Sequence, residues 1–132
     1  MEAAGMSRWT TLDRVVSVDP GKRATALRNV PNTLDIFDSH FPRFTVLPGV
    51  LILGSLGTLA AHLLEHETGR AWELRSAERV GFRHFVQPGD QLEITVELKQ
   101  RSDDAALLSG QVAVDGKVVT RARALRAAPV EG

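Results

Sequence analysis

The hydrophobic pattern of the chain predicts one buried helix among several strands. Apolar side chains surround residues 50–65 on nearly every side, which is typical of a helix that other parts of the protein cover. In residues 92–99, apolar and polar side chains alternate strictly, as they do in a strand with one buried face. Further strands are expected at 8–18, 22–30, 72–86, 105–114 and 117–126.

Turn sequences separate these segments. Asp-Pro-Gly at 19–21, Pro-Gly-Asp at 88–90 and Asp-Gly at 115–116 all favour tight turns. Three prolines make residues 31–48 mostly loop, and Gly69 is a plausible helix end. Residues 1–132 are therefore expected to form one α+β domain, with flexible ends at 1–7 and 127–132. About six antiparallel strands would wrap around the helix and leave a sheet edge for a second subunit.

Composition narrows the class of protein. The 132 residues include 16 Lys and Arg against 16 Asp and Glu, and this balance argues against nucleic-acid binding. The absence of cysteine excludes disulfides, thiolate metal sites and a cysteine nucleophile. The apolar helix is too short to cross a membrane, and the first residues are not typical of a signal peptide. A cytoplasmic protein is the expectation.

His40 is the ionisable residue of greatest interest. Imidazole takes up and releases protons near neutral pH, so His40 is a candidate general base. Pro42 stiffens its loop, and Pro48 and Gly49 lead into the helix, whose first amides can polarise a carbonyl. A loop histidine that only bonds to backbone is an open alternative.

A second histidine pattern is weaker. His62 and His66 stand four residues apart with Glu65 between them, as in some zinc peptidases, but no third ligand is evident. We therefore predict no metal site.

The segment 37–51 carries a family resemblance. Its sequence FDSHFPRFTVLPGVL resembles the signature of FabZ-type 3-hydroxyacyl-[acyl-carrier-protein] dehydratases, His-Phe-Pro-Gly followed by Pro-Val-Met-Pro-Gly-Val-Leu. Residues 80–92, VGFRHFVQPGDQL, resemble the family's later FRRPVxPGDxL stretch. The likeness extends over about 12–126.

This resemblance implies a hotdog fold that dimerises edge to edge. It implies an acyl-thioester substrate on the phosphopantetheine arm of an acyl carrier protein or on coenzyme A, with no other cofactor. His40 would be the general base, and the Gly49 N–H would polarise the thioester carbonyl. Further residues are expected to bind substrate (Phe41, Val50, Gly54 and Thr58) or to form a basic docking surface for a carrier protein (Arg43 and Arg83).

One departure from the family is important. The resemblance places the usual catalytic Glu or Asp at Gly54 and the following Gln at Thr58. The favoured interpretation is a dehydratase-like enzyme of a fatty-acid-like or polyketide-like pathway, in which His40 acts alone or with a water near Ser55 or Thr58. The alternatives are an atypical or supporting subunit of a heterodimeric dehydratase, an acyl-thioester binding protein, and a thioesterase.

Overall fold

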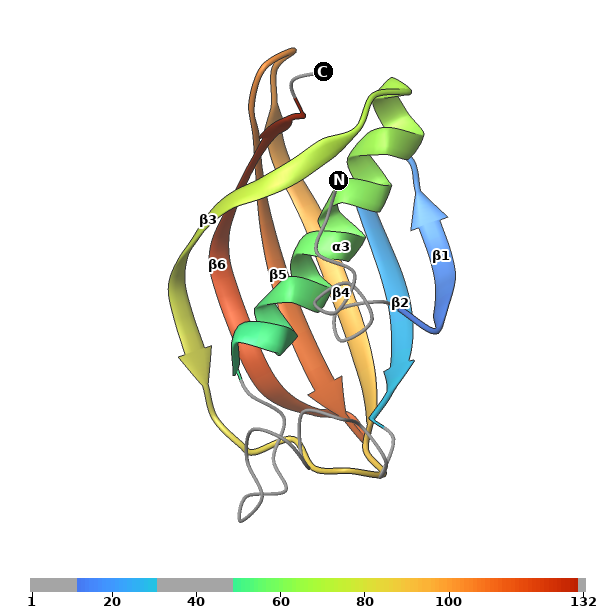
Figure 1. Cartoon of the computed structure of the whole chain (residues 1–132), viewed down its shortest axis with the longest axis vertical. Coiled ribbons are helices and arrows are strands. Elements are labelled where there is room, and N and C mark those ends of the chain that lie inside the picture. The colour runs from blue at the N-terminus through green and yellow to red at the C-terminus, as the bar shows by residue number, and fades with distance from the viewer. Residues whose placement is uncertain (1–11, 31–48, 131–132) are drawn as a thin grey trace.

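The computed structural model describes residues 12–30 and 49–130. One helix and six strands follow each other along these residues (Figure 1): β1 (Arg14–Asp19), β2 (Arg23–Asn29), α3 (Gly49–Thr68), β3 (Trp72–Phe82), β4 (Gln91–Arg101), β5 (Ala106–Val114) and β6 (Lys117–Pro129).

The six strands form one sheet in the order β1-β2-β4-β5-β6-β3. Every pair of neighbours is antiparallel. The helix α3 runs across one face of this curved sheet (Figure 1). Strand β3 forms one edge of the sheet, and β1 forms the other. The predicted architecture, a sheet of six antiparallel strands around one long helix, is confirmed.

The core lies between α3 and the sheet. Leu56, Leu59 and Leu63 of the helix are fully buried, together with Ile94 and Leu125 of the sheet. Burying each such side chain contributes about 1.5–3 kcal/mol to folding. This explains why the helix is apolar on most of its sides.

Gly110 lets the helix approach the sheet closely. A Cβ on this β5 residue would lie 2.7 Å from Leu56 Cδ2 and 3.0 Å from Leu125 Cδ1. No side chain larger than glycine fits there without a shift of its neighbours.

Several elements begin or end at other residues than the sequence predicts. The helix continues three residues further than expected, to Thr68, and ends at Gly69, whose φ is 74° and whose N–H donates to the Glu65 carbonyl at 2.8 Å. Residues 72–86 hold a single strand, β3.

The expectation that 127–132 is flexible is wrong for its first three residues. Strand β6 continues to Pro129, and Trp72 pairs with Pro129 across the sheet. Ala127 is buried because it packs into the core. No helix within the described residues has the length and apolarity to cross a membrane.

Candidate functional site

Gly49 is the first residue of the helix and contacts the ring of Phe82. A Cβ on Gly49 would lie 2.8 Å from Phe82 Cζ, so the tip of the ring rests against this glycine. Phe82 ends β3 and is half exposed, at 51%. The first turn of α3 contains no acidic residue, and its amides carry the partial positive charge of the helix dipole. This end of the helix is therefore suited to polarising a carbonyl oxygen.

Gly54 and Thr58 lie together one turn further along α3. The Thr58 hydroxyl donates to the Gly54 carbonyl at 2.9 Å. Gly54 is partly buried and Thr58 is exposed. The two predicted substrate-binding residues are thus neighbours, and neither supplies a carboxyl group.

Ser55 points into the protein, where it meets Arg28 of β2. Arg28 is 3% exposed, and its Nη1 donates to Ser55 Oγ at 2.8 Å. Burial lowers the pKa of the Arg28 guanidinium below its ordinary value, and the negative charge of Asp13 opposes this shift. Among the described residues, Arg28 forms no ion pair.

Several sequence-predicted residues lie outside the described residues. These are His40, Phe41 and Arg43, together with the side chain of Val50. Arg83 is exposed, and its backbone N–H donates to the Val119 carbonyl at 2.8 Å, just beyond the end of β3.

Within the described residues, the two helix histidines belong to no group that could hold a metal ion. His62 and His66 are both exposed. Across residues 12–30 and 49–130, no three His, Cys, Asp or Glu side chains come close enough to hold a metal ion.

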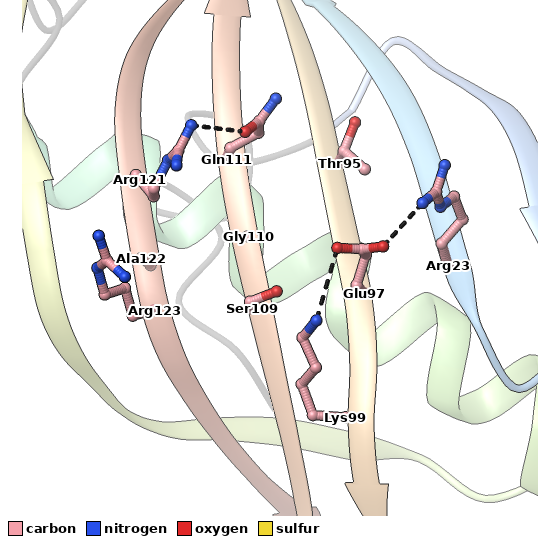
Figure 2. A pocket seen from close by; sticks show the side chains of 10 residues that line it. All are labelled: Arg23, Thr95, Glu97, Lys99, Ser109, Gly110, Gln111, Arg121, Ala122 and Arg123. Atoms are coloured by element: carbon pink, nitrogen blue, oxygen red, sulfur yellow. Dashed lines mark hydrogen bonds and ion pairs between the residues drawn. The ribbon is translucent and has the colours of Figure 1, made fainter.

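A basic groove lies on the sheet face opposite the helix (Figure 2). Arg23 and Lys99 stand on one side, where Glu97 contacts them at 2.7 and 3.7 Å. Arg121 and Arg123 stand on the other side, and Arg121 donates to Gln111 Oε1 at 3.4 Å. The fold brings these cations together from three strands. In the sequence, each had the pattern of an ordinary solvated strand residue.

Sequence reasoning also missed Phe82 and Arg28. Phe82 belongs to the stretch that resembles the family, but nothing in the sequence shows that its ring reaches Gly49. Arg28 could have been noticed from the alternation of β2, because it shares the buried face of Ala24 and Ala26.

The comparisons with known proteins identify the family. The profile of the ApeI-like family, described as ApeI dehydratase, matches residues 17–119. The chain belongs to the ApeI-like dehydratase family. The 3-hydroxyacyl-[acyl-carrier-protein] dehydratase FabZ of Oceanobacillus iheyensis is 36% identical to this ApeI-like chain over 114 residues, which cover 84% of the chain and 81% of the relative. The Bacillus subtilis enzyme of the same name is 36% identical over 111 residues, which cover 82% and 79%. The resemblance to FabZ-type dehydratases is therefore confirmed.

Solved structures confirm the fold of the ApeI-like chain as hotdog. A chain of the dehydratase heterocomplex ApeI:P from Xenorhabdus doucetiae has a TM-score of 0.76 with it at 17% identity, covering 98% of this chain and 87% of that one. The PaaI protein of the Escherichia coli phenylacetic acid degradation operon has a TM-score of 0.74 at 16% identity, covering 96% and 84%.

Proposed function

We propose that the chain is a dehydratase that removes water from 3-hydroxyacyl thioesters. The substrate would be carried on the phosphopantetheine of an acyl carrier protein, in a fatty-acid-like or polyketide-like pathway in the cytoplasm. The observation that carries this proposal is that a member of a dehydratase family has Gly49 at the first position of a buried helix.

The proposed reaction begins at the thioester carbonyl. The Gly49 N–H would donate to the carbonyl oxygen and stabilise the negative charge that develops on it. His40 would remove a proton from the carbon next to the carbonyl. The bond between the third carbon and its hydroxyl then breaks, and the hydroxyl leaves with a proton as water.

The source of that second proton is the unusual part of the mechanism. Position 54 has no side chain, and we infer that His40 returns the proton itself or through a water beside Thr58. The Thr58 hydroxyl is exposed and lies on the same face of the helix as Gly54, which supports this role.

The test is the conversion of 3-hydroxybutyryl-pantetheine, followed by mass. We expect wild-type protein to produce the unsaturated thioester and His40→Ala to lose at least a hundredfold in rate. His62→Ala, at an exposed histidine near the other end of the helix, is the control and should keep wild-type activity. Equal rates for wild type and His40→Ala would disprove the catalytic role.

A second candidate is one subunit of a heterodimeric dehydratase. The missing carboxyl group at Gly54 favours it, since a partner with Glu or Asp at the equivalent helix position could supply the acid. A neighbour in fold is described as a dehydratase heterocomplex, which is consistent with this candidate. It predicts that the chain alone is inactive and that activity appears when the partner is added.

Two further alternatives have distinct products. A thioesterase would release thiol from the acyl thioester, and another neighbour in fold is described as a thioesterase superfamily member. An acyl-thioester binding protein would bind saturably and leave the mass of the ligand unchanged. The mass and thiol measurements therefore separate the dehydratase, the thioesterase and the binding protein, and the addition of a partner identifies the heterodimer.

A further inference from the structure

Thr120 of β6 carries a buried hydroxyl group that lacks a hydrogen-bond partner. The residue has no exposed surface, and across the described parts of the chain its Oγ1 contacts no donor or acceptor. Leaving a hydroxyl buried and unpaired destabilises a fold, so nearly all such groups have a partner. An unpaired group of this kind is a candidate for binding a ligand.

The register of the sheet places Thr120 beneath the helix. Thr120 pairs with Val112 of β5, and Ala122 pairs with Gly110, which lies directly under Leu56. Residues two positions apart on a strand share a face, so Thr120 faces α3 as Ala122 does. Arg121 and Arg123 point to the opposite face, where they line the basic groove (Figure 2).

The same register joins Thr120 to the start of the helix. Phe82 is the β3 partner of Thr120, and its ring reaches Gly49. Side chains directly opposite each other in an antiparallel pair lie about 4.5–5.5 Å apart at Cβ. Gly49, Phe82 and Thr120 therefore lie at one corner of the sheet, where Phe82 is half exposed and Thr120 is fully buried.

We propose that the Thr120 hydroxyl binds the 3-hydroxyl of the acyl chain. This inference rests on the proposed function, in which the Gly49 N–H already holds the carbonyl oxygen. The 3-hydroxyl is the other oxygen of the substrate near the reacting carbons. A threonine hydroxyl both donates and accepts, so it matches an alcohol group. The substrate reaches Thr120 when the Phe82 ring turns aside.

The experiment compares two ligands and three variants of Thr120. The probes are 3-hydroxybutyryl-pantetheine and butyryl-pantetheine, which lacks the hydroxyl, and their dissociation constants are measured by calorimetry with His40→Ala as the background. Thr120→Val should weaken binding of the hydroxylated ligand by about three- to tenfold, the effect of one neutral hydrogen bond, and leave butyryl-pantetheine unaffected. Thr120→Ser keeps a hydroxyl and should bind the hydroxylated ligand as the background protein does. Thr120→Ala also lacks the hydroxyl and should weaken binding as Thr120→Val does.

Thr68→Val is the matched control. Its hydroxyl donates to the Leu64 carbonyl at 2.8 Å and accepts from Trp72 Nε1 at 2.9 Å, so it is fully engaged within the fold. We expect Thr68→Val to lower the melting temperature and leave both dissociation constants unchanged. Thr120→Val should keep or raise the melting temperature, because it removes an unpaired group.

The outcomes separate this inference from the proposed function. If the background protein binds both ligands and Thr120→Val changes neither dissociation constant, the Thr120 hydroxyl does not bind the ligand and the inference is wrong. If Thr120→Val selectively weakens the hydroxylated ligand while wild-type protein fails to dehydrate it, the binding role stands and the dehydratase proposal fails. If wild-type protein does not dehydrate the hydroxylated ligand and the background protein binds neither ligand, both are overturned.

Discussion

The guanidinium of Arg28 donates from β2 to Ser55 Oγ of α3 at 2.8 Å, in the buried space between sheet and helix. A buried cation held by a neutral hydroxyl is costly to desolvate, and the lowered pKa of Arg28 has this burial as its main cause. The contact links the second turn of the helix to the strand that precedes the segment containing His40.

Ser55→Ala should therefore destabilise the protein more than the loss of a surface contact would. It leaves the Arg28 donor without this partner, and the expected loss in the free energy of unfolding is about 1–3 kcal/mol. Urea denaturation followed by circular dichroism measures it. The double variant Arg28→Met with Ser55→Ala removes the buried charge as well and should recover most of the loss. A double variant less stable than Ser55→Ala would show that Arg28 stabilises the fold by other means.

Gly110→Ala should strain the contact between helix and sheet. The added methyl group would lie 2.7 Å from Leu56 Cδ2, and overpacking of this kind costs about 1–3 kcal/mol. Gly81→Ala is the control, since this strand glycine has no heavy atom within 4 Å of an added Cβ. Thermal unfolding of both variants provides the comparison. Equal melting temperatures would mean that Leu56 yields at no cost.

The elements of this fold were predictable because their patterns are local. The strict alternation in β4 and the turn sequences beside β1, β2, β5 and β6 locate five strands, and the long apolar run without charges indicates a covered helix. The end of β6 was not predictable, since Ala127 and Pro129 look like a loose tail until Trp72 pairs with them across the sheet. Strand pairing between distant residues leaves no mark in local composition.

The candidate site was predictable only along the resembling segments. Gly49, Gly54 and Thr58 follow one another on the helix, so their proximity follows from helical spacing. The contacts of Phe82 with Gly49 and of Arg28 with Ser55 join residues 33 and 27 positions apart, respectively, in the chain. Contacts of that range depend on the whole sheet, and one sequence does not reveal them.

The pair of Arg23 and Glu97 gives a small pH dependence of stability. The hydrogen bond from Arg23 and then the charge of Lys99 hold the pKa of Glu97 below its ordinary value. A carboxyl group with a lowered folded-state pKa contributes stability that is present above its unfolded pKa and is lost as the pH falls through the folded one. The Glu97 side chain is 41% exposed, so solvent screens the effect and the change should be small. Denaturation curves of Glu97→Gln should therefore show a shallower loss of stability in acid than wild type, while at neutral pH Glu97→Gln is the less stable protein. If the free energy of unfolding falls equally steeply with pH in both proteins, this account is wrong.

Restoring a carboxyl group at position 54 tests whether the site is otherwise complete. Gly54 is only partly buried, and long side chains on a helix lean toward its first residue, so a glutamate here would extend toward Gly49. A positioned general acid contributes about 10²–10⁴-fold to a rate, and we expect Gly54→Glu to accelerate dehydration of 3-hydroxybutyryl-pantetheine by at least tenfold. Gly54→Gln has nearly the same shape and carries no acidic proton, so it should stay at or below the wild-type rate. If Gln and Glu raise the rate equally, the gain comes from filling space or from helix propensity, since glycine costs about 1 kcal/mol in a helix interior. The double variant Gly54→Glu with His40→Ala tests whether the new acid needs the base. If the double variant shows no gain in rate, base and acid act on the same substrate, and this protein supplies both.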